Sequence, residues 1–129
     1  MELYTKEQTD RFWKFVNYLC WDPVEHNAET MRSALLREVT PQNAELYHSI
    51  AQHLISTLYV KYYTEYSDKS KLGAALANII GAGEREYSRA LKSEKSVSAA
   101  YDTADIMNSF IDAIPKADDY YHNPAELEY

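Results

Sequence analysis

Apolar residues recur along this chain at the three- and four-residue spacing of α-helices, and no stretch shows the alternation typical of a half-buried β-strand. The pattern predicts helices near residues 6–20, 23–39, 41–66, 71–92 and 97–115. Glycine and proline occur only 3 and 4 times, which favours a small number of long helices. We therefore predict an all-α, single-domain bundle of about five helices, with short connections marked by proline or serine.

Three of these helices have clear start signals. Thr5 and Gln8 have the spacing of a capping box, in which each side chain bonds the backbone of the other residue. Asp22-Pro23 and Thr40-Pro41 each place an N-cap residue before a proline, which is tolerated at the first helical position. These signals predict that helices begin at residues 6, 23 and 41.

The fourth helix contains the segment Gly81-Ala82-Gly83, across which the apolar register continues. Glycine inside a helix costs about 1 kcal/mol relative to alanine. Close packing against a neighbouring helix would account for that cost, so we predict one helix over 71–92 with Gly83 at a helix contact. In the fifth helix, Asn108 falls within the apolar stripe and needs hydrogen-bond partners if it is buried.

The charge is uneven along the chain. The sequence has 20 acidic and 13 basic residues and a net charge of −7. We divide it into a helical bundle domain, 1–115, and an acidic, tyrosine-containing C-terminal tail, 116–129, expected to be extended or disordered unless something docks it. The acidic residues of the tail are Asp118, Asp119, Glu126 and Glu128.

This composition disfavours several classes of protein. An acidic surface repels phosphate backbones, so we expect no direct binding of nucleic acid, although the charge can also serve solubility alone. No apolar stretch approaches the roughly 20 residues that span a bilayer, and no signal peptide is evident, so we expect no membrane contact. The lone Cys20 excludes an internal disulfide and lies on the apolar face of the first helix, where we expect it buried. These features predict a cytoplasmic protein.

No motif for catalysis, a metal or a cofactor stands out, and we expect none of the three. His48 and His53 are five residues apart, which places them on different sides of a helix. Glu45 and His48 have the Glu-x-x-His spacing of di-iron helical bundles, but such sites need two of these elements and two further glutamates. A carboxylate–histidine enzyme therefore remains one alternative.

Tyrosine is the most distinctive residue of the chain, with 12 copies. Four of them follow one another at helical spacing in the third helix, and a fifth precedes them. Two interpretations are open: a half-buried core with hydroxyl groups at its rim, or a face that binds a partner, since tyrosine is a frequent interface anchor. The residues of this predicted binding face are Tyr47, Tyr59, Tyr62, Tyr63 and Tyr66.

Together these features predict a small acidic binding protein without catalysis. We expect an inhibitor or antagonist that blocks a partner protein with a basic surface, as anti-defence and toxin-immunity proteins do. The expectation rests on size and charge, because acidity favours approach to targets that handle nucleic acid. Besides the enzyme, the other alternative is a helical protein that binds or sequesters a small molecule. The chain could form a homo-oligomer under any of these interpretations.

Overall fold

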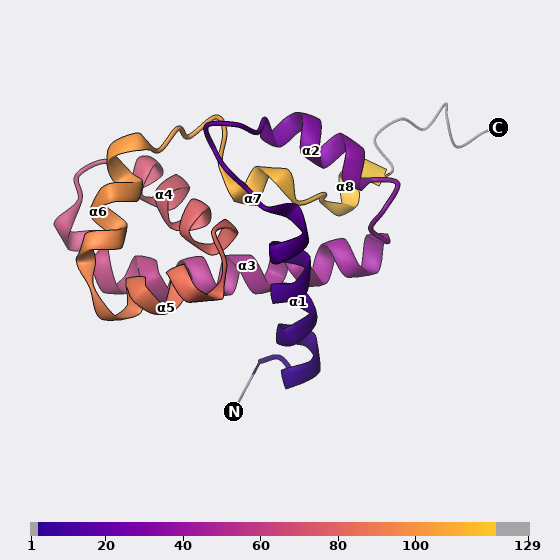
Figure 1. Ribbon diagram of the computed structural model, residues 1–129, viewed down its shortest axis with the longest axis horizontal. Helices are drawn as coiled ribbons and strands as arrows, with labels where there is room; N and C mark the ends of the chain where they lie inside the picture. Colours follow the sequence, from indigo (N-terminus) through magenta and orange to yellow (C-terminus); the bar gives the residue numbers. More distant parts are fainter. Residues whose placement is uncertain (1–2, 121–129) are drawn as a thin grey trace.

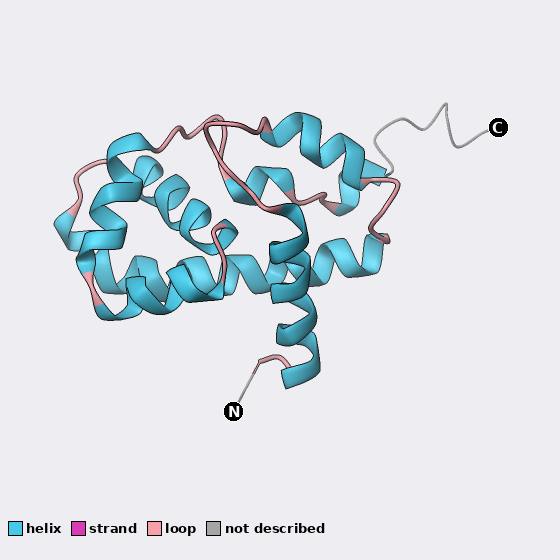
Figure 2. Cartoon of the chain, viewed as in Figure 1, coloured by secondary structure: helices cyan, strands magenta, loops and turns pink. Residues whose placement is uncertain are grey.

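Helices make up most of the chain in the computed structural model, which describes residues 3–120 (Figure 1). Figure 2 shows helices joined by loops, and no residue in the described range is in a β-strand. The predicted helical class is thus confirmed, but about five helices is too few. The elements are α1 (Lys6–Leu19), α2 (Ala28–Leu35), α3 (Pro41–Tyr62), the 3₁₀ turn η1 (Tyr63–Glu65), α4 (Lys69–Gly81), α5 (Glu84–Lys92), α6 (Glu94–Thr103), α7 (Phe110–Ala113) and α8 (Ala117–Tyr120).

Two predicted helix starts are confirmed. At α1, the Thr5 hydroxyl oxygen accepts from the Gln8 backbone, and the Gln8 side chain accepts from the Thr5 backbone, which completes the capping box. At α3, the hydroxyl oxygen of Thr40 accepts from the backbone of Asn43, with Pro41 at the first helical position. Both starts depend only on residues within one helical turn, which is why the sequence reveals them.

The predicted start of the second helix is wrong. The Asp22 carboxylate accepts from the backbone nitrogen of Val24 at 2.9 Å and forms a turn there instead of capping a helix. Helix α2 begins at Ala28, after Asn27, whose side chain accepts from the backbone of Thr30. Asn27, five residues after Asp22, is therefore the N-cap of this helix.

The predicted helix over 71–92 is two helices. Gly83 has a φ of +117°, which other residues rarely adopt, and it separates α4 from α5. A Cβ atom placed on Gly83 would have only the Asn17 side chain nearby, at 3.6 Å. The predicted close packing at Gly83 is therefore wrong, since Asn17 of α1 lies only at ordinary contact distance. The close approach lies at Gly81, where a Cβ atom would be 2.7 Å from the rings of both Phe110 and Trp21.

The last predicted helix is also shorter than expected, since α6 ends at Thr103. A loop carrying Asn108 follows, and the expectation that this side chain needs partners holds: it bonds to the backbone of Pro23, His26 and Ala28. These bonds hold Asn108 against the segment that leads into α2, where it lies in a loop and not on a helix.

The beginning of the predicted tail is helical and docked. In α8 the Tyr120 hydroxyl donates to the carbonyl oxygen of Val39 at 2.6 Å, and the Asp119 carboxylate lies 3.7 Å from the Arg32 guanidinium. Glu126 and Glu128 lie outside the described residues. The division at residue 115 stays a prediction.

Helix α3 runs along the length of the molecule (Figure 1). Helices α4, α5 and α6 pack at its C-terminal half, α2, α7 and α8 gather at its N-terminal half, and α1 crosses it. A buried polar contact joins these parts: the Asn78 side chain of α4 accepts from Trp21 Nε1 at 2.9 Å and from the backbone of Phe110 at 3.0 Å.

Candidate functional site

Three tyrosines of the predicted binding face lie in the core. The side chains of Tyr47, Tyr62 and Tyr66 are only 6%, 4% and 9% exposed. The Tyr62 hydroxyl donates to the carbonyl oxygen of Ala90, and the Tyr66 hydroxyl donates to the carboxylate of Glu94. Burial raises the pKa of both phenols. For these three residues the core interpretation holds, and their expected exposure is wrong.

The reason lies at the end of α3. The helix stops at Tyr62, η1 follows, and Tyr66 has an extended backbone with φ −127° and ψ 131°, so its side chain does not continue the helical stripe. Ala90 and Glu94, which accept from the two hydroxyl groups, belong to α5 and α6. Helices α5 and α6 therefore cover the side of α3 for which the sequence allowed either burial or exposure.

The other two tyrosines remain at the surface. Tyr59 is half-buried and Tyr63 is 46% exposed, and their rings stack with centroids 6.0 Å apart and 13° between the planes. Val60 beside them is 72% exposed, and the Lys69 ammonium lies 5.5 Å from the centroid of the Tyr63 ring. The role of this pair as a binding face stays a prediction.

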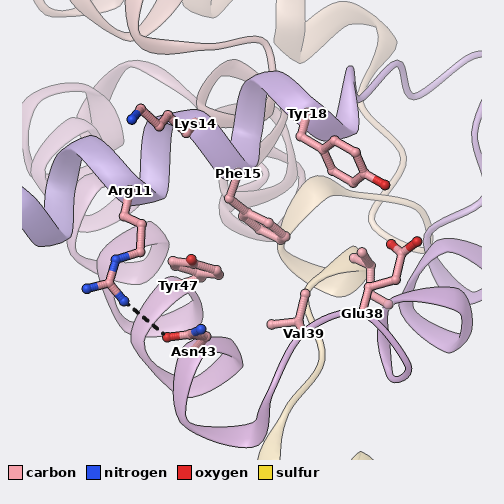
Figure 3. Close-up of a pocket in the computed structure, with 9 residues that line it drawn as sticks. Arg11, Lys14, Phe15, Tyr18, Glu38, Val39, Asn43 and Tyr47 are labelled. Atoms are coloured by element: carbon pink, nitrogen blue, oxygen red, sulfur yellow. Dashed lines mark hydrogen bonds between the residues drawn. The ribbon is translucent and has the colours of Figure 1, made fainter.

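A more extensive concave surface runs between α1 on one side and α2 with the start of α3 on the other. We call it the α1–α2 groove. It consists of two hollows of about 570 and 620 Å³ that share Tyr18, Leu35 and Glu38. Figure 3 shows the first hollow, where the rings of Phe15 and Tyr47 stack with centroids 4.5 Å apart. Each hollow falls within the size range of ligand pockets.

The second hollow has an apolar lining and an acidic border. Leu19, Met31 and Ala34 contribute apolar surface, and Glu25 and Glu38 contribute the carboxylates. Within the described chain, none of its lining residues is a lysine or an arginine. Neither glutamate forms an ion pair with a described residue. This end of the groove is therefore apolar with uncompensated negative charge.

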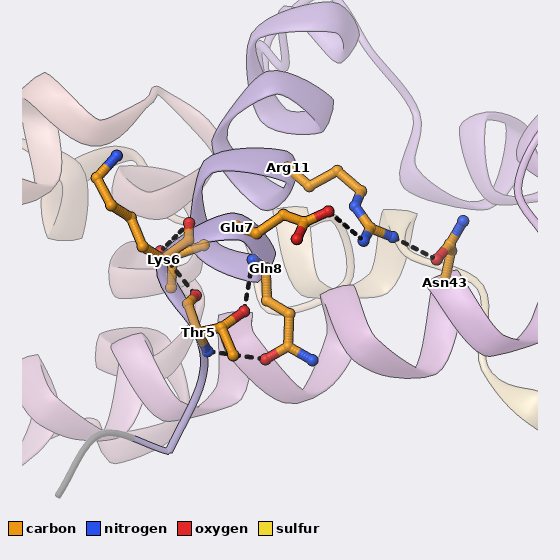
Figure 4. Close-up of polar contacts among 7 residues, drawn as sticks. Thr5, Lys6, Glu7, Gln8, Arg11 and Asn43 are labelled. Atoms are coloured by element: carbon orange, nitrogen blue, oxygen red, sulfur yellow. Dashed lines mark hydrogen bonds and ion pairs between the residues drawn. The ribbon is translucent and has the colours of Figure 1, made fainter.

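The opposite end of the groove is basic. The Arg11 guanidinium lies 3.4 Å from the side-chain oxygen of Asn43 and 3.7 Å from the carboxylate of Glu7 (Figure 4). Lys14, one turn further along α1, makes no ion pair with any described residue. The groove thus carries charge of opposite sign at its two ends.

The end of α1 leaves the groove open. Cys20 has a φ of 49° and turns the chain after Leu19. Trp21 then enters the core, while Tyr18 stays on the last turn of α1 with 68% of its surface exposed. Cys20 itself is exposed, so its predicted burial is wrong. The left-handed backbone at Cys20 removes its side chain from the apolar face of the helix.

The histidine and carboxylate residues do not converge. Glu45 is exposed, whereas the Nε2 atom of His48 is buried and has no hydrogen-bond partner among the described residues. Burial lowers the pKa of His48, and the nearby charge of Lys116 lowers it further. No group of three or more His, Cys, Asp or Glu side chains within residues 3–120 could hold a metal ion. The geometry assigns His48 to packing in its neutral form.

Sequence reasoning missed most of the groove. In the predicted helix 23–39 the apolar spacing puts five residues on one stripe, of which only Ala28 and Leu35 are buried; the other three are Val24, Met31 and Val39. One residue of the groove could have been found from the sequence. Tyr18 lies beside the apolar stripe of the first helix and not on it, which indicates an exposed ring. No local pattern reveals that α1 and α2 stay apart.

No helix within residues 3–120 is both long and apolar enough to cross a bilayer. Comparison with protein-family models, curated proteins and solved structures finds no match for this chain.

Proposed function

We propose that this protein binds a partner protein without catalysis and blocks it by receiving a basic, amphipathic helical segment in the α1–α2 groove. The observation that carries the proposal is the second hollow, where apolar side chains meet Glu25 and Glu38, two carboxylates without ion-pair partners. Amphipathic helices bind in apolar grooves of this kind through residues spaced along one face.

The charge of the groove favours one orientation of the bound segment. Lysine or arginine side chains of the partner would lie near Glu25 and Glu38, and an acidic side chain would lie near Lys14. From Arg11 to Tyr18 the helix α1 rises by about 10 Å, so the first hollow accommodates about two turns of a partner helix. The net charge of −7 would also speed the encounter with a basic surface.

Binding in the α1–α2 groove would block the partner, because the bound helix could no longer contact its own target. A basic amphipathic helix that works on nucleic acid would lose its charged face to the two glutamates and its apolar face to Tyr18, Met31 and Leu35. An exposed aromatic such as Tyr18 is a suitable anchor, because its ring gives contact area at a low cost in side-chain entropy.

A titration with a synthetic amphipathic helix of leucine and lysine tests this proposal. We expect binding in fluorescence anisotropy that weakens as salt rises, and no binding of the matched leucine–glutamate helix. The double variant Glu25→Gln/Glu38→Gln should lower the affinity about tenfold, the equivalent of about 1.4 kcal/mol. Glu45→Gln, which removes an exposed carboxylate on α3, serves as the control and should bind normally. Unchanged affinity in the double variant would contradict the proposal.

The size of the two hollows also supports the small-molecule alternative. A thermal-shift screen against aromatic acids and nucleotides separates the two functions, since a ligand at 100 times its dissociation constant stabilises by about 2.7 kcal/mol. The carboxylate–histidine alternative has less support, because Glu45 faces solvent while His48 Nε2 is turned into the protein.

A further inference from the structure

Three exposed apolar side chains lie on two loops that hydrogen bonds of Asn108 hold together. They are Val24, between α1 and α2, and Ile106 and Met107, between α6 and α7; we call them the loop platform. Their exposed fractions are 85%, 53% and 83%. Figure 1 shows the two loops meeting beside α2. Single exposed apolar residues are common, whereas contiguous exposed apolar patches often mark binding surfaces.

Both loops hold their apolar tips in the same way. The Asp22 carboxylate accepts from the backbone of Val24 at 2.9 Å, and the Asp105 carboxylate accepts from the backbone of Met107 at 2.8 Å. In each turn the aspartate fixes the backbone two residues later. The apolar side chain at that position then points away from the protein.

Asn108 ties the two loops together. Its amide nitrogen donates to the carbonyl oxygens of Pro23, at 3.1 Å, and His26, at 2.8 Å, and its side-chain oxygen accepts from the backbone of Ala28 at 2.7 Å. Both donors and the acceptor of this amide are therefore used. The platform is held in one arrangement before any partner arrives, which lowers the ordering cost of binding.

The charge around the platform indicates what covers it. Residues 22–27 and 102–109 contain four carboxylates and neither lysine nor arginine, and none of the four forms an ion pair with a described residue. Negative charge opposes contact with an anionic membrane, with nucleic acid and with a second copy of the same surface. A protein surface with an apolar patch could cover the apolar side chains of the platform, and lysine or arginine residues around that patch could pair with the four carboxylates.

We infer that the loop platform is a second contact for the partner, engaging an apolar patch flanked by basic residues. This inference rests on the proposed function, because Glu25 and His26 of the same loop line the α1–α2 groove. A partner helix that fills the groove can thus continue onto Val24 and Met107. Methionine adapts its shape to a partner, which suits such a contact.

Methionine labelling tests the platform and the groove in one experiment. The chain has three methionines, and Met31 lines the groove while Met107 belongs to the platform. With ¹³C-methyl methionine in the full chain, we titrate the leucine–lysine helix and assign the two signals with Met31→Leu and Met107→Leu. We expect both signals to shift along one binding curve.

Each outcome has a distinct meaning. A shift at Met31 alone overturns the platform and leaves the groove standing, whereas a shift at Met107 alone supports the platform and contradicts the groove. No shift at either methionine overturns both. Shifts of Met107 produced equally by the leucine–glutamate helix would overturn the inferred basic partner.

Two matched variants separate the apolar and charged contributions. Val24→Ser/Met107→Ser should weaken binding of the leucine–lysine helix about tenfold, whereas Leu3→Ser, 68% exposed before α1, should not. Asp22→Asn/Asp105→Asn keeps the side-chain oxygens that bond the two turns but removes both charges, so binding should lose part of its salt dependence. Asp68→Asn at the start of α4 is the charge control. Unaltered binding in both double variants would overturn the inference.

Discussion

Helices α4 and α2 begin alike but end in different surroundings. Each has a side-chain N-cap, Asp68 for α4 and Asn27 for α2, that accepts from the backbone three residues later. Yet nine of the 13 residues of α4 are buried, against two of the eight residues of α2, Ala28 and Leu35. Capping therefore determines where a helix begins, and the number of its neighbours determines what it exposes.

The neighbours account for the difference. Helix α4 packs against α3, α5, α6 and α7, and its small residues let them approach; Gly81 lies directly against the rings of Phe110 and Trp21. Helix α2 packs mainly against α7 and leaves its other side to the α1–α2 groove. We expect the closed side to carry the stability, and the open side is the one that we propose for binding.

The largest loss of stability is expected at Tyr62, where α3 packs against α5. Tyr62→Ala removes a buried ring and its bond to Ala90, and should lower the free energy of unfolding by about 3–5 kcal/mol, the range of buried aromatic truncations. Tyr63→Ala, on the exposed side of the same segment, should cost about 1 kcal/mol or less. Urea unfolding followed by circular dichroism measures both. Equal losses in the two variants would remove the distinction between core and surface tyrosines.

The second effect concerns the polar contact inside the core. Asn78→Ala leaves the Trp21 indole N–H and the Phe110 backbone N–H without their acceptor in a buried setting. Each unsatisfied donor costs about 1–3 kcal/mol, so with two donors we expect a loss of at least about 2 kcal/mol in urea unfolding. Trp21 fluorescence should also shift, since its indole loses a polar neighbour. A variant as stable as the wild type would show that water replaces the amide.

The third prediction compares one substitution at two places in α4. Gly81→Ala puts a Cβ atom 2.7 Å from two rings and should cost about 1–3 kcal/mol through overpacking. Gly73→Ala meets no atom within 4 Å and should stabilise the helix by up to about 1 kcal/mol. Thermal melts of the two variants should therefore move in opposite directions. Movement in the same direction would contradict the close contact at Gly81.

A smaller effect depends on pH. The pKa of His48 is lowered in the folded protein, chiefly by burial, from an ordinary value of 6.5. The unfolded chain therefore binds the proton more readily, and stability falls as the pH drops through that ordinary value. The charges of Asp112 and Asp119 act in the opposite direction and raise the pKa of His48. Melting temperatures at pH 7.5 and 5.5 should differ less in His48→Gln than in the wild type, and an unchanged difference would refute this role.

The smallest effect is expected in the groove. Tyr18 is 68% exposed and buries little area, so Tyr18→Ser should change the free energy of unfolding by about 0.5 kcal/mol or less. The same variant should weaken binding of the leucine–lysine helix. Loss of stability without loss of binding would show that Tyr18 is buried in solution, and would contradict its exposure in the α1–α2 groove.

Some features of the fold were readable from the sequence because their causes are local. The capping box of Thr5 and the Thr40-Pro41 start are settled within a few residues, and both were predicted correctly. The break at Gly83 was missed because the apolar register continues across it, and only the backbone angle marks the boundary. The candidate site was hardly predicted at all, since Tyr47 is the one predicted residue that lines the groove.

By itself, the sequence determined the helical class, the acidic charge and two helix starts, because spacing, composition and capping are properties of short segments. Tertiary structure decided which aromatic rings face solvent. Tyr62 is buried by Ala90, 28 residues further along the chain, and Tyr18 stays exposed because α1 turns at Cys20 and α2 packs elsewhere. Burial depends on contacts between segments distant in sequence, and periodicity within one helix does not show which of its faces a later helix will cover.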